Sequence, residues 1–126
     1  MIILVVDDDP AILNALDANL TSFGYHVVTA KGGFEALKII KSSRSENELV
    51  RFLVTDLKMP GMNGIELIRS SRKLIPNLKA ILITAYGDNN VRKVIKGLGG
   101  CDYLEKPFEP EMLQKLIMEL KACKAS

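Results

Sequence analysis

The sequence predicts an α/β protein in which a five-stranded parallel sheet carries helices on both faces. Short runs of apolar and β-branched residues alternate along the chain with segments whose apolar residues recur at helical spacing. Such runs are typical of strands buried in a parallel sheet. Polar or charged residues end or directly follow four of the runs. In a parallel sheet these strand ends share one edge, and ligands bind at that edge in open α/β folds.

Length and composition indicate one globular domain, residues 1–126, with a sizeable core. Hydrophobic residues make up 48% of the chain and charged residues 25%, which argues against disorder. A net charge of +2 is too small to favour nucleic acid, and no apolar run approaches the roughly 20 residues that span a bilayer. Cys101 and Cys123 show neither metal-site spacing nor a disulfide framework, so we expect a reduced, cytoplasmic protein.

The first half of the chain predicts two strands and two helices. Asp9 suits the N-cap of the first helix and Pro10 its first turn, so we expect no metal contact from Asp9. In order, the expected elements are a strand at 2–6, a helix from Pro10 that Gly24 ends, a strand at 25–30 at a sheet edge, a helix with Phe34, Ala36, Leu37 and Ile40 on one face, and a polar loop at 42–47.

The second half predicts three more strands and three more helices. In order, the expected elements are a strand at 52–55 that runs into Asp56, a turn-rich loop at 57–64, a helix at 65–75, a strand at 80–84, a helix with Val91, Val94, Ile95 and Leu98, a strand that runs to Lys106–Pro107, and a helix with Leu113, Leu116, Ile117 and Leu120. Right-handed crossovers place helices on both faces, and the sheet order 2-1-3-4-5 would make the first and third strands neighbours.

Five side chains are expected to meet at the carboxyl edge of this sheet: Asp7, Asp8, Asp56, Thr84 and Lys106. Crowded carboxylates repel one another, and an oxygen-liganded Mg²⁺ relieves that repulsion. A hydroxyl and an ammonium can bind the oxygens of a phosphoryl group, which brings nearly two negative charges. The set therefore predicts a crevice that holds a divalent cation and moves a phosphoryl group.

The whole chain resembles the receiver domain of two-component response regulators, a CheY-like superfamily with a doubly wound, flavodoxin-like fold. Each matching motif alone is weak, because paired aspartates or a Lys-Pro pair are common. Together, in order and on the expected elements, they make a specific signal. The motifs are Val5–Asp9, Thr55–Asp56, Met59–Gly64, Ile83–Ala85 and Lys106–Phe108.

The resemblance implies a set of metal and phosphoryl ligands. Asp56 is the phosphoryl acceptor, Asp8 and Asp56 bind Mg²⁺ directly, and Asp7 acts mainly through water. The backbone carbonyl of Lys58 completes the protein ligands, and Mn²⁺ should substitute for Mg²⁺. Lys58 and Tyr86 also occupy positions that vary across the family and tune the lifetime of the phosphoryl group.

The resemblance implies that Thr84 and Lys106 bind the phosphoryl oxygens. It also implies a cis Lys106–Pro107 bond that aims the ammonium inward, and a Tyr103 ring that swings inward when Thr84 moves. The residues alone leave two alternatives open, namely an ordinary trans bond and a Tyr103 that packs with its hydroxyl in solvent. Gly99–Gly100 replaces a more usual Gly-Ala pairing and is expected to loosen this segment, because glycine loses much entropy on ordering.

The implied function is a phosphorylation-dependent signalling switch rather than an enzyme, since the domain would catalyse only its own phosphorylation and dephosphorylation. A sensor histidine kinase or a phosphotransfer protein would supply the phosphoryl group. The acyl phosphate would alter the face formed by the last two helices and the strand between them, and this face would control an output domain or a partner. Homodimers through the same face are also considered. Direct binding of nucleic acid or membrane is not expected.

Two rival functions are weighed against this hypothesis. A Mg²⁺-dependent phosphohydrolase can use an aspartate nucleophile at a strand end, but it typically adds a second acid two residues later, where this chain has Lys58. A flavin-binding module can share the sheet order, but its phosphate loop is rich in Ser, Thr and Gly. Here Asp7–Pro10 follows the first strand and would repel a phosphate in the absence of metal.

Overall fold

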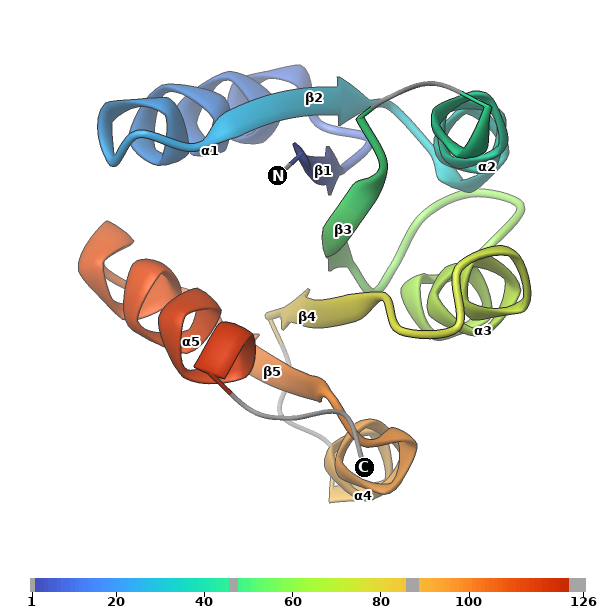
Figure 1. Cartoon of the computed structure of the whole chain (residues 1–126). Coiled ribbons are helices and arrows are strands. Elements are labelled where there is room, and N and C mark those ends of the chain that lie inside the picture. Colours follow the sequence, from blue (N-terminus) through green and yellow to red (C-terminus); the bar gives the residue numbers. More distant parts are fainter. Residues whose placement is uncertain (1, 46–47, 86–88, 123–126) are drawn as a thin grey trace.

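Within the described residues, five strands alternate with five helices (Figure 1). The computed structural model describes residues 2–45, 48–85 and 89–122, so Tyr86 and Cys123 lie outside the described residues. The strands are β1 (Ile2–Val6), β2 (His26–Ala30), β3 (Val50–Asp56), β4 (Lys79–Thr84) and β5 (Cys101–Glu105). The helices are α1 (Pro10–Ser22), α2 (Gly33–Arg44), α3 (Gly64–Leu74), α4 (Asn89–Leu98) and α5 (Pro110–Ala122). None of these helices combines the length and the apolar content that a membrane span needs.

The strands form one parallel sheet of order β2-β1-β3-β4-β5. This confirms the predicted fold class and strand order, including the position of β2 at an edge. Val6 of β1 pairs with Thr55 of β3. The residues that follow these two at the carboxyl edge are Asp7 and Asp56. The ends of β4 and β5 lie beside them, so the sheet register alone gathers the predicted side chains.

The sheet separates two apolar layers, with α1 and α5 on one face and α2, α3 and α4 on the other (Figure 1). Side chains of successive strand residues point to opposite faces. In β1, Ile3 and Val5 pack in the α1 and α5 layer, whereas Leu4 and Val6 pack in the other. Burying each such side chain contributes ~1.5–3 kcal/mol. A slip of one residue would exchange the two faces, so the core fixes where each strand ends.

Side-chain caps fix the starts of the two helices that follow the acidic strand ends. Asp9 caps α1, as predicted, because its Oδ1 accepts a hydrogen bond of 2.9 Å from the Ala11 amide. Asn63 and Glu66 form a capping box at α3, in which each side chain accepts from the other residue's amide at 2.9 and 3.4 Å. An N-cap is worth about 1 kcal/mol, and these two caps hold the far ends of the loops after β1 and β3.

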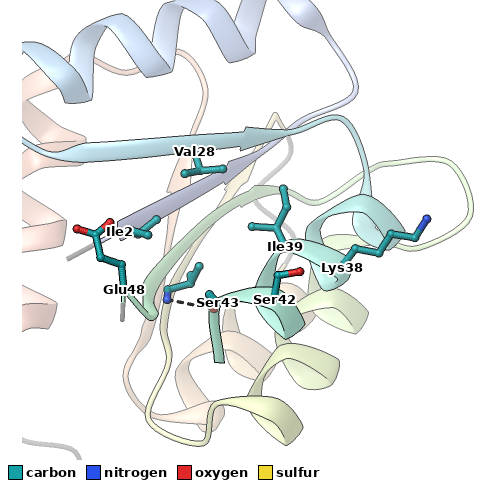
Figure 2. A pocket seen from close by; sticks show the side chains of 8 residues that line it. Ile2, Val28, Lys38, Ile39, Ser42, Ser43 and Glu48 are labelled. Carbon is teal, nitrogen blue, oxygen red and sulfur yellow. Dashed lines mark hydrogen bonds between the residues drawn. The ribbon is translucent and has the colours of Figure 1, made fainter. Parts of the chain in front are cut away.

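The prediction of a loop at 42–47 is wrong for its first three residues, because α2 continues to Arg44. Ser43 is buried, and its hydroxyl donates to the Ile40 carbonyl at 2.7 Å and accepts from the Val50 amide at 3.4 Å. Figure 2 shows Ser43 on the inner side of α2 with this bond to the start of β3 drawn as a dashed line. A serine that bonds back to its own helix satisfies its hydroxyl, so polar composition did not end the helix here.

The assignment of Phe34 to the inward face of α2 is also wrong, because 63% of this residue is exposed. The buried residues of α2 are Gly33, Ala36, Ile40 and Ser43. With about 100° of rotation per residue, Phe34 lies roughly 200° around the helix from Ala36. Its ring instead lies beside Gly61, where an added Cβ would be 3.3 Å from a ring carbon.

Candidate functional site

Three carboxylates meet at the carboxyl edge, at the ends of β1 and β3. One oxygen from each of Asp7, Asp8 and Asp56 lies within 4.8 Å of the other two, a spacing that allows them to share one cation. Asp7 is buried, Asp56 is intermediate and Asp8 is exposed. The site is therefore closed toward the core and open toward solvent, as a metal that keeps bound water requires.

Lys106 brings a positive charge to these carboxylates from the end of β5. Its Nζ lies 3.8 Å from Asp7 Oδ2 and 3.7 Å from Asp56 Oδ1, and both distances are too long for direct hydrogen bonds. The Lys106–Pro107 bond is cis, in agreement with the expectation from the sequence. The ammonium therefore neutralises the carboxylates at a distance that leaves space between the groups.

Backbone amides orient two of the carboxylates. Asp7 Oδ1 accepts from the Asp9 amide at 2.9 Å, and Asp56 Oδ1 accepts from the Leu57 amide at 3.0 Å. A bond to the ionised form normally lowers the pKa of a carboxyl. In both aspartates other influences outweigh this one.

The pKa values of Asp7 and Asp56 both lie above the ordinary value of 3.8. Burial is the largest cause in each case, and the negative charge of a neighbouring carboxylate adds to it: Asp56 for Asp7, and Asp8 for Asp56. Lys106 acts in the opposite direction on both. One ammonium does not offset the burial of these charges, so the donor set suits a divalent cation with oxygen ligands.

The loop after Asp56 is held close to the strand that it leaves. The Leu57 amide donates to the Ile83 carbonyl at 3.0 Å, and the Gly64 amide donates to the Leu57 carbonyl at 2.8 Å. A Cβ at Gly64 would lie 2.4 Å from the Asp56 carbonyl oxygen, so only glycine fits there. The sequence marked Gly64 as a turn former, but its close approach to Asp56 could not be foreseen from the pattern.

A second close approach holds the middle of this loop. A Cβ at Gly33, the first residue of α2, would lie 2.7 Å from the sulfur of Met62. Met59 is buried in the core on the same side of the sheet. The loop that carries Lys58 is thus packed against the start of α2 as well as against β3.

Thr84 completes the crevice from the end of β4. A cavity of about 170 Å³ opens between Asp56, Leu57, Lys58, Thr84, Ala85 and Lys106. Thr84 is buried, and its carbonyl accepts from the Lys106 amide at 2.9 Å. The five predicted side chains and the Lys58 segment are therefore gathered in one place, although the ligand role of the Lys58 carbonyl stays a prediction.

Tyr103 lies on β5 beside Arg92 of α4. It is partly buried, and the Arg92 guanidinium lies 4.9 Å from the centre of its ring. Arg92 also pairs with Glu105 at 3.3 Å. No sequence pattern predicts the contact of Arg92 with Tyr103, since it joins residues of different elements.

A second cavity, of about 320 Å³, lies at the opposite, amino edge of the sheet (Figure 2). Ile2, Val28 and Ile39 line it, with Lys38 and Glu48 also among its lining residues. Of the two cavities, the one at the carboxyl edge is lined by Asp56, a member of the cluster of three acids that could hold a metal, and none of the three lines the cavity at the amino edge. The chemistry of the fold is concentrated there.

Comparison with known proteins assigns the class of this fold and site. Residues 3–118 match the family model described as the response regulator receiver domain. The chain therefore belongs to the receiver domain family of two-component response regulators, which serve phosphorylation-dependent signalling.

Curated relatives include both long and short proteins. Transcriptional regulatory protein GlrR from Escherichia coli (strain K12) is 35% identical over 115 residues, which cover 91% of this chain but 25% of that protein. Sporulation initiation phosphotransferase F from Bacillus subtilis (strain 168) is 29% identical over 124 residues, covering 98% of this chain and 96% of that protein. The chain thus spans a quarter of one relative and almost the whole of another.

Solved structures share the architecture closely. A response regulator receiver domain protein from Clostridium thermocellum superposes with a TM-score of 0.84 at 29% identity, covering 94% of this chain and 92% of that one. The chemotaxis protein CheY4 of Vibrio cholerae gives a TM-score of 0.81 at 26% identity, covering 94% and 97%. These similarities agree with the sheet order and the placement of the helices.

Proposed function

We propose that this protein is a Mg²⁺-dependent phosphorylation switch whose phosphoryl acceptor is Asp56. The observation that carries the proposal is the convergence of Asp7, Asp8 and Asp56 within 4.8 Å beside a cavity that Thr84 and Lys106 also line. A signalling switch needs a nucleophile, a site for the cation and groups that respond to the new charge. The crevice offers all three.

In the proposed reaction, a carboxylate oxygen of Asp56 attacks phosphorus in line with the leaving group. An oxygen–phosphorus bond forms, and the phosphorus–nitrogen bond of a phosphohistidine breaks. The electron pair goes to the imidazole, which leaves with the partner. The product is an acyl phosphate on Asp56. In the slow return step, water attacks phosphorus, the bond between phosphorus and the Asp56 oxygen breaks, and inorganic phosphate leaves the regenerated carboxylate.

Asp8 and Asp56 would bind the Mg²⁺ directly, Asp7 would act mainly through water, and the carbonyl of Lys58 would complete the protein ligands. Bound Mg²⁺ neutralises the charge that builds up between the carboxylates and the phosphoryl oxygens. The raised pKa values of Asp7 and Asp56 support this assignment, because burial, and after it a neighbouring carboxylate, disfavours the charged forms that a cation would stabilise. Mn²⁺ should substitute for Mg²⁺.

Thr84 and Lys106 would turn the chemistry into a signal. The hydroxyl and the ammonium would bind the oxygens of the phosphoryl group on Asp56, which are present only after the reaction. They would therefore favour one state of a two-state equilibrium. The responding face is that of α4, β5 and α5, on which Tyr103 and Arg92 lie. A ring that follows Thr84 inward would leave the Arg92 guanidinium that now covers it.

The phosphoryl donor would be a sensor histidine kinase or a phosphotransfer protein, with residues 1–126 acting as the receiver domain. The face of α4, β5 and α5 would control an output domain in a longer natural chain or a separate partner, or would form a homodimer. Relatives of both lengths support these arrangements. We place the protein in the cytoplasm, where a kinase of this type presents its phosphohistidine.

Phosphorylation by a small donor tests the proposal. Phosphoramidate with Mg²⁺ should add one phosphoryl group to the protein, as read by intact mass, and EDTA should prevent it. Asp56→Asn should abolish the gain. Asp9→Asn is the matched control, because it removes the carboxylate that directly follows Asp8 in the sequence while keeping a good N-cap. An equal mass gain in Asp56→Asn would place the chemistry on another residue.

A further inference from the structure

Arg72, near the end of α3, reaches out of its own helix to three backbone carbonyls. Its Nε donates to Leu78 at 3.0 Å, in the segment before β4. Its Nη1 donates to Leu98 at 2.6 Å, and its Nη2 donates to Gly99. A single guanidinium therefore joins the end of α3, the start of β4 and the end of α4.

The Leu98 carbonyl is the last one of α4, and the Gly99 carbonyl follows it directly. The last four carbonyls of a helix have no amide within the helix, and they carry the negative end of its dipole. A guanidinium is planar, always charged and carries five donors in a fixed arrangement, so it can serve two adjacent carbonyls at once. Lysine, with one compact charge, cannot reproduce that geometry.

The contact falls on the segment that the sequence marks as loose. Gly99 and Gly100 both have left-handed backbones, with φ of +68° and +64°. A Cβ at Gly100 would lie 3.0 Å from Arg72 Nη2, which shows how closely the side chain covers the turn. Arg72 thus offsets the freedom of two successive glycines.

The neighbouring helix has a matching contact. Lys79, the first residue of β4, donates through its Nζ to the Leu120 carbonyl in the last turn of α5. Both helices of the proposed signalling face are therefore held at their carboxyl-terminal ends, at the amino edge of the sheet. Their amino-terminal ends lie at the other edge, next to the phosphorylation crevice.

We propose that Arg72 is a positioning residue that fixes a pivot at the carboxyl-terminal end of α4. This inference rests on the proposed function, because it describes how the response to Asp56 travels. On phosphorylation the amino-terminal half of α4 moves, while Leu98 and Gly99 stay in place. The moving half carries the exposed pair of Arg92 with Glu105, and an exposed pair resists movement weakly.

Amide hydrogen exchange of the unphosphorylated protein tests the clamp itself. Two amides report on it: Gly99, which donates to the Lys96 carbonyl, and Ala80, which donates to the Gly100 carbonyl. In Arg72→Ala both should exchange about tenfold faster or more, since bonds to a charged donor are lost. Arg72→Lys should recover only part of the protection. Lys73→Ala, which removes the same charge from the exposed neighbour, is the control and should behave as wild type.

Beryllofluoride, a mimic of the acyl phosphate, tests the pivot. In the wild type the amide shifts should be large from Asn89 to Lys93 and small at Leu98 and Gly99. In Arg72→Ala the shifts should extend through Gly99, and in Thr84→Ala they should be small throughout α4. Amides of Val5 and Val6 in β1 serve as the reference for intact folding, and Arg72→Lys replaces Arg72→Ala if that reference changes.

Three outcomes separate the inference from the function on which it rests. Wild-type shifts that are uniform along α4 would overturn the pivot while leaving the switch intact. Unchanged exchange at Gly99 and Ala80 in Arg72→Ala would overturn the clamp. A wild type that shows no response to beryllofluoride and Mg²⁺ anywhere would overturn the proposed function, and the exchange data would still decide whether Arg72 holds α4.

Discussion

The two edges of the sheet treat charge in opposite ways. At the carboxyl edge, three carboxylates gather within 4.8 Å, two of them beside the Lys106 ammonium, and burial raises the pKa of Asp7 and Asp56. At the amino edge, Arg72 and Lys79 bond to the last carbonyls of α4 and α5. The carboxyl edge carries an excess of negative charge that a bound cation would neutralise. At the amino edge, the protein's own cationic side chains neutralise the partial negative charge of the helix ends.

The difference follows from the direction of the chain. In a fold of alternating parallel strands and helices, every helix ends where the next strand begins, so the carbonyl ends of the helices gather at the amino edge. Cations placed there stabilise the protein whatever is bound elsewhere. The loops at the carboxyl edge are left to supply function. The amino ends of the strands thus carry contacts that stabilise the fold, and the carboxyl ends carry the groups that would respond to a ligand.

The largest expected effect comes from breaking the packing of the carboxyl edge. In Gly64→Ala the new Cβ would meet the Asp56 carbonyl at 2.4 Å, and backbone cannot yield cheaply. We expect a loss of about 3 kcal/mol in the free energy of unfolding. Gly97→Ala is the control, since nothing lies within 4 Å of its added Cβ and alanine suits a helix interior. Urea unfolding measures both, and equal stabilities would show that the loop after Asp56 adapts.

The second prediction concerns the direct and water-mediated ligands. Asp8→Ala should weaken Mg²⁺ binding by at least about tenfold, and by more than Asp7→Ala does. Isothermal titration of the two variants decides the order. Amide shifts at Leu98 and Gly99 should stay unchanged during the titration, because the amino edge has its own partners. The reverse order of affinities would exchange the roles of Asp7 and Asp8.

The smallest effect is a dependence of stability on pH. The pKa of Asp56 in the folded protein lies above the ordinary value of 3.8. At pH values between 3.8 and the folded-state pKa, the folded state therefore binds more protons than the unfolded chain. Stability of the metal-free protein should therefore fall as the pH rises through that window. Asp56→Asn should then raise the melting temperature at pH 7 in EDTA, by roughly 2–5 °C.

Two controls sharpen that measurement. The advantage of Asp56→Asn should shrink as the pH falls toward 3.8, where the carboxyl of the wild type becomes neutral as well, and it should shrink again when Mg²⁺ is added. Asp9→Asn, at an exposed N-cap, should show neither trend. A lower melting temperature for Asp56→Asn at pH 7 would mean that the ion pair with Lys106 outweighs the burial of the charge.

Features that depend on strand register could be predicted from the sequence, and features that join distant elements could not. The apolar runs gave the strands, and their order placed Asp7 beside Asp56. The polar composition of Ser42–Arg44 wrongly predicted a loop, because a buried serine can bond back to its own helix. The apolar side chain of Phe34 wrongly predicted burial, because the position around the helix decides which residues are buried. Arg72 gave no signal, since its partner Leu98 lies 26 residues away.

The bond between the Lys106 amide and the Thr84 carbonyl has a consequence for how a signal starts. It continues the ladder of β4 and β5 beyond the pair of Thr84 with Glu105, so the backbone of Thr84 is held in the sheet. The side chain can then follow a phosphoryl oxygen only by turning about its χ1 bond. A β-branched side chain occupies a few separate staggered rotamers rather than a continuous range. In the proposed switch the first event would therefore be a jump between discrete rotamers of Thr84, and the response that follows would have two states rather than a continuous range.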